Sequence, residues 1–369
     1  MIPLSRPYIE EEEIQSVVKV LKSGILCQGP KLEEFEKKFS RVIGTKYAVA
    51  VNSGTSGLHL ALKSLGIKKD DEVITSPFSF VASANCALYE GAKPVFADVE
   101  DDTFNINPNL IEEKINQKTK FILPVHVFGQ CCDMDPIIKL SKKCDLKLVE
   151  DACESIMATY KGRNAGTFSD AAIFAFYPNK QITTAEGGMI VTNNDRVNIL
   201  CQSYRNQGRS DNKQWLTHVR LGYNYRMTDL NAAIGIEQLK KLPKFIKYRE
   251  YYSQLYHEEL EKVDGVNLPI IRKGNKHSWF VFPIRVKEKI RNRVIKELAK
   301  FKIESKAYFY PCIHLQPFYI EKYGYKEGDF PIAEELSKTT IVLPFYNGLQ
   351  EKDVKYVAKS LKTILRRLN

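Results

Sequence analysis

The feature that most constrains the fold of this chain is the regular alternation of short apolar runs with amphipathic stretches up to about residue 235. The apolar runs predict buried strands, and the stretches between them predict helices. The expected strands cover residues 47–51, 72–75, 94–98, 121–127, 146–149, 171–176 and 189–192, and the expected helices include 58–65 and 81–90. Because the strands are continuously apolar and alternate with helices, they predict an α/β domain built on a mostly parallel sheet.

The last third of the chain has a different pattern. Residues 228–242 carry apolar side chains at helical spacing and predict a helix that joins two domains and stops before Pro243. The elements expected beyond it are strands over 280–286 and 341–344 and helices over 287–301 and 351–368. We therefore expect a large α/β domain over residues 1–235 and a smaller C-terminal α+β domain over residues 236–369.

Composition excludes several classes of protein. With 44% hydrophobic and 27% charged residues, the chain is neither disordered nor a membrane protein, and it has no long apolar run. The first residues lack the cationic and apolar regions of a signal peptide, so we expect a cytoplasmic protein. The eight cysteines form no C-x-x-C pair, which predicts reduced thiols and no metal site.

The positive charge of the chain is concentrated in its last third. The formal net charge is +11, of which residues 240–369 contribute +12 and residues 1–239 contribute −1. No run of five Lys or Arg residues occurs, and no stripe alternates basic with stacking aromatic residues, so we expect no nucleic-acid partner. The basic third is either a solvated face or a field that attracts an anionic substrate.

Three polar segments follow predicted strands of the first domain. Residues 52–57 (Asn-Ser-Gly-Thr-Ser-Gly) precede a helix whose free N–H groups would bind an anion, unless they form an ordinary strand–helix link. Asp151 ends a strand at the edge where open α/β sheets bind ligands, unless it only caps the next helix. Lys180 lies in a turn of aromatic and small residues, where its amine can be a nucleophile, unless it is a surface lysine.

The order of these segments narrows the alternatives. A phosphate-type turn, then a carboxylate, then a lysine roughly 30 residues later is what pyridoxal phosphate (PLP) requires. The helix N-terminus would hold the phosphate, Asp151 would pair with the ring nitrogen, and Lys180 would form the Schiff base. The sequence therefore predicts PLP as the cofactor.

The chain also resembles a known family, the fold-type I, PLP-dependent sugar aminotransferases of the DegT/DnrJ/EryC1/StrS group. The resemblance covers nearly the whole chain. The motifs that carry it are residues 23–24, 28–30, 53–55, 70–74, 124–130, 150–152, 176–188, 222–226 and 311–317. Within the group, the 176–188 segment and Glu154 look most like perosamine synthase and other enzymes that aminate C4 of a nucleotide-linked 4-keto-6-deoxy sugar.

The resemblance implies a role for ten residues. Lys180 and Asp151 are implied as the catalytic pair, with Lys180 also as the proton carrier. Asn224 is implied to reach the phosphate from the other subunit, which implies a homodimer with shared active sites. The other implied cofactor contacts are Gly54 and Thr55 at the phosphate, Phe80 stacked on the ring and Glu154 at the ring hydroxyl. The implied substrate contacts are His314, Arg226 and Tyr310.

The chain departs from the family pattern at four positions, one of which is Lys69, where many members have glycine before the acidic residues. Ala175 stands where many members have a serine that bonds the phosphate, so Ser53, Ser56 or water must compensate. Ile25 stands where many have tryptophan, which bears on the substrate, and Ala185 replaces a common glycine. Some relatives are dehydratases with histidine in place of the lysine, so Lys180 favours transamination.

We therefore expect an aminotransferase that moves an amino group, from glutamate, to C4 of a nucleotide-linked 4-keto-6-deoxy sugar, for surface polysaccharide biosynthesis. One alternative is an enzyme of the same fold that acts on a C3-keto sugar or a non-nucleotide ketone. The other, of a different class, is a regulatory or nucleic-acid-binding protein that uses the basic third.

Overall fold

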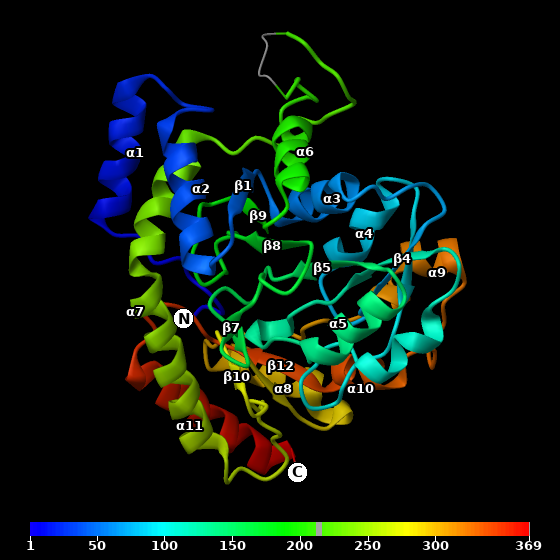
Figure 1. Cartoon of the computed structure of the whole chain (residues 1–369). Coiled ribbons are helices and arrows are strands. Elements are labelled where there is room, and N and C mark those ends of the chain that lie inside the picture. The colour runs from blue at the N-terminus through cyan, green and yellow to red at the C-terminus, as the bar shows by residue number, and fades with distance from the viewer. Residues whose placement is uncertain (212–215, 369) are drawn as a thin grey trace.

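The protein is described by a computed structural model that covers residues 1–211 and 216–368, and its centre is a seven-stranded sheet (Figure 1). The strand order is β1-β9-β8-β5-β4-β2-β3. The strands are β1 (Tyr47–Val51), β2 (Glu72–Thr75), β3 (Lys93–Phe96), β4 (Thr119–Leu123), β5 (Lys147–Asp151), β8 (Ala171–Ala175) and β9 (Gly188–Thr192). Only β9 is antiparallel to its neighbours, which confirms the mostly parallel sheet.

Helices cover both faces of the sheet, as the continuously apolar strands require. Val49 and Val51 of β1 pack in the core with α3 (Gly54–Ser64) and α4 (Ala82–Leu88), whereas Ala48 and Ala50 pack in the core with α2 (Pro30–Ile43), α5 (Met134–Lys143) and α7 (Asp229–Leu260). Figure 1 shows α1, α2 and α7 side by side. The helices of this part are α1 (Glu11–Ser23), α2 (Pro30–Ile43), α3 (Gly54–Ser64), α4 (Ala82–Leu88), α5 (Met134–Lys143) and α6 (Asp195–Arg205).

The strand expected over 121–127 ends earlier than the apolar run does. β4 stops at Leu123, because Pro124 has no N–H group to donate to a neighbouring strand. Contact with β5 continues beyond it through single bonds, with the N–H of Asp151 donating to the Pro124 carbonyl and the N–H of His126 donating to the Asp151 carbonyl. This local break brings residues 127–129 over the end of β5 as a short 3-10 turn.

The joining helix is much longer than expected. α7 (Asp229–Leu260) continues through Pro243, so the prediction that it stops before this residue is wrong. Pro243 removes one backbone hydrogen bond, but Leu239, Leu242 and Phe245 around it are all buried against the core. Burial of the apolar face on both sides of the proline therefore maintains the helix.

The C-terminal part is an α+β unit with its own apolar core. Its main elements are β11 (Phe282–Arg285), β12 (Thr340–Leu343), α8 (Glu288–Lys300), α9 (Pro317–Tyr323), α10 (Pro331–Thr339) and α11 (Glu351–Leu368). β11 and β12 pair antiparallel, and a small separate sheet joins β10 (Asn275–Lys276), β6 (Thr159–Tyr160) and β7 (Arg163–Asn164). The predicted domain boundary at 235/236 falls inside α7, and the start of the chain contacts the C-terminal unit, where Ile2 bridges to Ile303.

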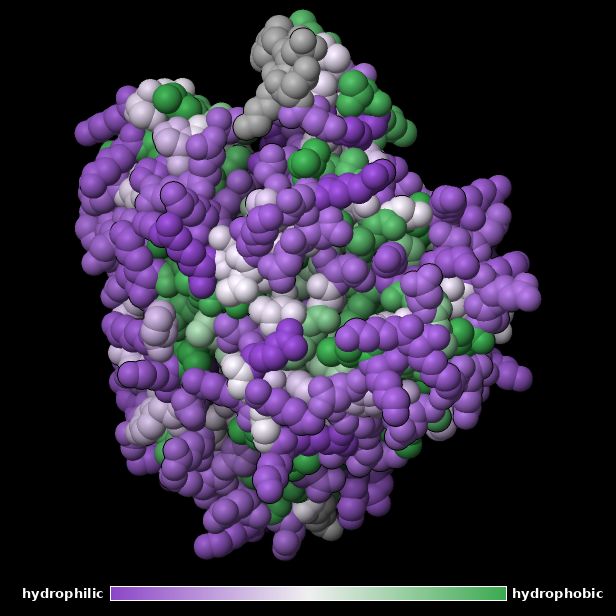
Figure 2. Space-filling model, viewed as in Figure 1, coloured by the Kyte–Doolittle hydropathy of each residue, from purple (hydrophilic) through white to green (hydrophobic). Residues whose placement is uncertain are grey.

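The surface of the face in Figure 2 is mainly hydrophilic, with smaller hydrophobic patches between the charged side chains. Over the described parts of the chain, no helix combines the length and the apolarity that crossing a membrane would need.

Candidate active site

A pocket of about 1370 Å³ opens at the carboxyl ends of the parallel strands. Its walls come from the β1–α3 turn, the segment after β2, the ends of β5 and β8, and residues 307–322 of the C-terminal unit. This edge of an open α/β sheet is where ligands bind, as the sequence predicted. Seven of the ten predicted site residues line this pocket: Gly54, Thr55, Phe80, Asp151, Glu154, Lys180 and Tyr310.

One wall of the pocket is the N-terminus of α3. The Ser53 side chain accepts from the Ser56 N–H at 3.1 Å, and the Ser53 carbonyl accepts from the Gly57 N–H at 3.1 Å. The N–H groups of Gly54 and Thr55 have no acceptor among the described residues, as expected for the first turn of a helix. The free N–H groups and the positive end of the helix dipole therefore make this end of the pocket a site for an anion.

The position of Ala175 explains why Gly54 is a glycine. A Cβ atom added to Gly54 would lie 2.8 Å from the Cβ of Ala175 and 3.0 Å from the Sγ of Cys153.

Ser56, one of the residues expected to compensate for the serine that Ala175 replaces, does not face the phosphate end of the pocket. It is 5% exposed and donates to Asn52 Oδ1 at 2.6 Å instead. The Thr55 hydroxyl, which lines the pocket without a partner among the described residues, is better placed to supply that donor.

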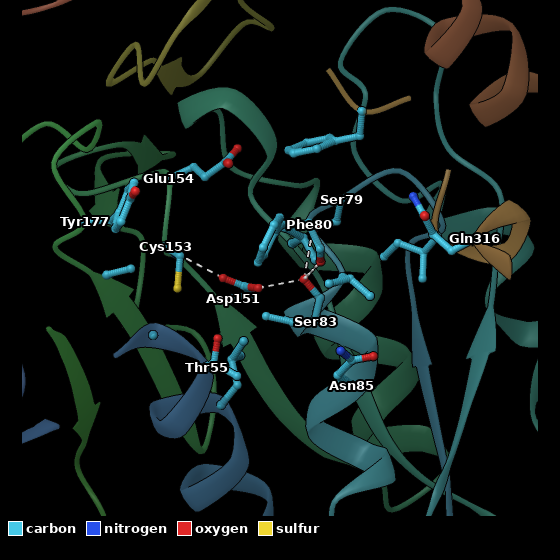
Figure 3. Close-up of a pocket in the computed structure, with 18 of the residues that line it drawn as sticks. Thr55, Ser79, Phe80, Ser83, Asn85, Asp151, Cys153, Glu154, Tyr177 and Gln316 are labelled. Carbon is cyan, nitrogen blue, oxygen red and sulfur yellow. Dashed lines mark hydrogen bonds between the residues drawn. The ribbon is translucent and has the colours of Figure 1, made fainter. Parts of the chain in front are cut away.

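Asp151 lies at the centre of the pocket floor. Figure 3 shows it between Cys153 and Ser83, with Thr55 at the start of α3 below them. Its carboxylate is 5% exposed and accepts from Ser83 Oγ at 2.8 Å and from the Cys153 N–H at 3.1 Å. These two donors orient the carboxylate toward the pocket, and Asp151 does not cap a following helix.

The neighbouring Glu150 points to the other side of the strand and has a structural role. Its buried carboxylate accepts from His126 Nε2 at 2.9 Å, from the Gly166 N–H at 2.7 Å and from Ser169 Oγ at 2.7 Å. Burial alone would raise the pKa of Glu150, but these donors hold it below its usual value. His126 Nδ1 accepts from the Cys132 N–H, so Nε2 is the nitrogen that carries the proton.

The Lys180 amine lies between a carboxylate and an aromatic ring. Its Nζ atom is 3.4 Å from Glu154 Oε1 and 3.9 Å from the centroid of the Phe280 ring, and its side chain is 13% exposed. The other Glu154 oxygen accepts from the Phe128 N–H at 2.8 Å. Burial raises the pKa of Glu154 although the Lys180 amine and the Phe128 N–H favour its charged form.

The mouth of the pocket is lined by exposed aromatic side chains. Phe80 is 63% exposed and Tyr310 is 54% exposed, and the Tyr310 ring packs on the Arg291 guanidinium at 4.4 Å. Exposed Tyr89, Tyr177 and Phe318 line the same mouth. Large apolar side chains in solvent mark binding surfaces, so this rim is suited to a partly apolar ligand.

His314 does not reach the pocket, contrary to the sequence prediction. It is fully buried in a short 3-10 turn, where its Nε2 lies 3.1 Å from Glu334 Oε1 and its ring packs on Phe330. Its neighbour Ile313 lines the pocket instead. The 3-10 turn sends adjacent side chains in different directions, which the motif alone did not reveal.

Asn224 and Arg226 lie outside the pocket of their own chain. Asn224 bridges to Asn206, and Arg226 Nη1 donates to Asn206 Oδ1 at 3.0 Å. Their expected place at the site of a second subunit stays a prediction.

Sequence reasoning missed three residues that shape the site. Ser83 holds Asp151, Phe280 covers the Lys180 amine, and Tyr308 lines the pocket beside it. A serine in the first turn of a helix that follows a parallel strand was a usable signal for Ser83. Phe280 and Tyr308 come from the C-terminal unit, and nothing in the local pattern linked them to Lys180.

The chain is similar to known aminotransferases in both fold and sequence. Spr1654 of Streptococcus pneumoniae, named as a candidate sugar aminotransferase and solved in its PMP form, matches with a TM-score of 0.95 and 29% identity over 100% of both chains. The chain therefore has the fold of the fold-type I PLP-dependent transferases, as predicted. The sequence profile of the DegT/DnrJ/EryC1/StrS aminotransferase family matches residues 7–362, and the chain belongs to this family.

Two relatives extend this result. The spore coat polysaccharide biosynthesis protein SpsC of Bacillus subtilis is 38% identical over 99% of this chain and 97% of its own. The GDP-perosamine synthase of Caulobacter vibrioides is 37% identical over 99% of this chain and 98% of its own. The expected resemblance is confirmed, and membership of an aminotransferase family favours the enzyme over the regulatory alternative.

Proposed function

We propose that the protein is a PLP-dependent aminotransferase that moves an amino group from glutamate to C4 of a nucleotide-linked 4-keto-6-deoxy sugar, for the synthesis of a surface polysaccharide. The names of two relatives, a GDP-perosamine synthase and a spore coat polysaccharide biosynthesis protein, support the substrate class. The observation that carries the proposal is the meeting of Lys180, Asp151 and the N-terminus of α3 in one pocket.

The residues present fit PLP. The free N–H groups of Gly54 and Thr55, with the Thr55 hydroxyl, suit a phosphate. The buried Asp151 carboxylate suits a protonated ring nitrogen, and the Lys180 amine suits an aldehyde. Phe80 offers a ring at the pocket mouth against which the cofactor can stack.

When bound, PLP supplies a carrier for the amino group and a ring that accepts electrons. The chain supplies the proton transfer, for which the Lys180 Nζ atom is the acid and base inside the pocket. Glu154, 3.4 Å away, orients this amine, and the Phe280 ring shields it from water. Ser83 and Cys153 keep the Asp151 carboxylate turned toward the pocket.

The pocket has room and charge for the proposed substrate. Its volume of about 1370 Å³ exceeds the roughly 300–1,000 Å³ of an ordinary ligand site, so it can hold a cofactor together with a sugar nucleotide. Lys322 and the exposed Tyr310 lie on the rim that the C-terminal unit supplies. The +12 charge of residues 240–369 favours the approach of a diphosphate.

A homodimer is part of the proposal. Asn224 and Arg226 lie away from the pocket of their own chain, as residues that serve the site of a second subunit would. In a dimer with two-fold symmetry, the commonest oligomer, each subunit would offer these two residues to the pocket of the other.

A panel of substrates tests the proposed function. The enzyme loaded with the aminated cofactor should react with nucleotide-linked 4-keto-6-deoxy sugars, and the product should carry nitrogen at C4 by mass spectrometry and NMR. Preference for a C3-keto sugar or for a ketone without a nucleotide would instead support the alternative of the same fold. Absence of a reaction with every ketone would refute the proposal.

A further inference from the structure

A buried arginine without a counter-ion lies behind the active-site lysine. Arg249 projects from the second half of α7 and is 2% exposed, and no carboxylate of the described chain forms an ion pair with it. Burial lowers its pKa to about 9, so the guanidinium is charged at neutral pH. Burial of an unpaired charge costs free energy that its hydrogen bonds must offset, so its partners indicate its role.

The first arm of hydrogen bonds leads from Arg249 to the two groups that contact the lysine amine. Arg249 Nη1 donates to the Phe280 carbonyl at 3.1 Å and to the Trp279 carbonyl at 2.8 Å. The Phe280 ring lies 3.9 Å from Lys180 Nζ. The Phe280 N–H donates to the Phe128 carbonyl at 2.9 Å, and the Phe128 N–H donates to Glu154 at 2.8 Å. The position of both the ring and the carboxylate thus depends on this arm.

The second arm leads to the turn that carries the lysine. Arg249 Nε donates to Asn347 Oδ1 at 2.9 Å, and Asn347 Nδ2 donates to the Gln181 carbonyl at 2.8 Å. Gln181 directly follows Lys180, and its side chain donates to the Glu154 carbonyl at 2.7 Å. Both residues of this arm are buried, at 1% for Gln181 and 6% for Asn347. The two arms therefore converge on one amine from two directions.

We propose that Arg249 is a positioning residue for the Lys180 amine, and that it holds in place the ring, the carboxylate and the turn that surround this amine. The planar guanidinium presents donors in a fixed fork, which is what two diverging arms require. The assignment rests on the proposed function for the reacting role of Lys180. Through Arg249, the packing of the C-terminal part of the chain then fixes the ring, the carboxylate and the turn around the Lys180 amine.

Two variants test the hydrogen bonds of the arms separately from the positive charge of Arg249. Arg249→Lys keeps a cation but lacks the fork, so it cannot serve both arms. Asn347→Asp still accepts from Arg249 Nε but has no N–H to donate to the Gln181 carbonyl. Leu298→Ala is the matched control, because it removes a fully buried side chain of the C-terminal core outside the two arms.

The readout is the reactivity of the lysine amine in the folded full-length protein. Hydroxylamine first releases any carbonyl compound from the amine and is removed by gel filtration, and limiting acetic anhydride then labels the lysines. Peptide mass spectrometry gives the labelling of Lys180 relative to Lys322, a second lysine of the pocket. We expect this ratio to rise about threefold or more in both arm variants, because the ring and the carboxylate no longer cover the amine. Leu298→Ala should leave it unchanged.

An unchanged ratio in the folded Asn347→Asp protein, or an equal rise in Leu298→Ala, would overturn the assignment. Where Arg249→Lys yields too little folded protein, Asn347→Asp alone decides. Labelling needs no cofactor, so it reports on Lys180 even in a protein that does not bind PLP. Failure to bind PLP would refute the proposed function alone.

Discussion

Replacing Asp151 by asparagine changes the charge of the pocket and hardly its shape. The carboxylate accepts from the Cys153 N–H at 3.1 Å and from Ser83 Oγ at 2.8 Å. An asparagine oxygen can still accept from Cys153, and its amide can donate to Ser83, whose hydroxyl can turn to the Phe80 carbonyl 3.2 Å away. We therefore expect Asp151→Asn to lose about 1 kcal/mol or less of unfolding free energy and to retain PLP.

The expected effect on the reaction is far larger, because a negative charge is lost. At about 4 Å and an effective dielectric constant of about 20, a pair of opposite charges contributes about 4 kcal/mol. That energy corresponds to about a thousandfold in rate if Asp151 stabilises the protonated ring nitrogen of the cofactor.

The assay compares turnover with stability. Steady-state turnover and urea unfolding would be measured for Asp151→Asn and for Ser83→Ala, which keeps the charge and removes one donor. We expect Ser83→Ala to cost about tenfold in turnover. Near-wild-type turnover of Asp151→Asn would refute the reasoning and leave Asp151 with a structural role only.

Three further outcomes are expected. Gly54→Ala, whose new Cβ would lie 2.8 Å from that of Ala175, should lose about 1–3 kcal/mol of stability in urea and bind PLP more weakly, and unchanged stability would contradict the packing. Mixed Lys180→Ala and Asn224→Ala subunits should regain about a quarter of wild-type activity if each site uses both subunits, whereas no recovery would argue against shared sites. The kcat/KM for the sugar nucleotide should fall with ionic strength while kcat changes little, because residues 240–369 carry +12, and a flat salt profile would remove the proposed role of that charge.

The sheet was predictable because each strand contains a short apolar run whose residues do not alternate with polar ones. β1 and β2 have the expected bounds, and the polar residues that follow the strands meet at one edge as parallel strands require. Local patterns were less reliable at prolines. Pro243 lies inside a helix whose two sides are buried, so tertiary packing outweighed the local cost of the proline.

The candidate site was predictable where it lies on the strand ends and unpredictable where the C-terminal unit completes it. Asp151 ends β5 and Lys180 follows the neighbouring strand β8, so the order of the chain implies that they are close. Phe280 and Arg249 reach the lysine only through the packing of the second unit, for which no local signal exists. His314 was misplaced because a motif fixes the identity of a residue and not the direction of its side chain.

The most direct test of the central claim is to trap the cofactor on its lysine. The full-length protein, incubated with PLP and reduced with borohydride, would be digested and its peptides mapped by mass spectrometry. The pyridoxyl group should be found on Lys180, whose amine lies in the same pocket as Asp151 and the N-terminus of α3. A pyridoxyl group on any other lysine, or on none, would contradict the account.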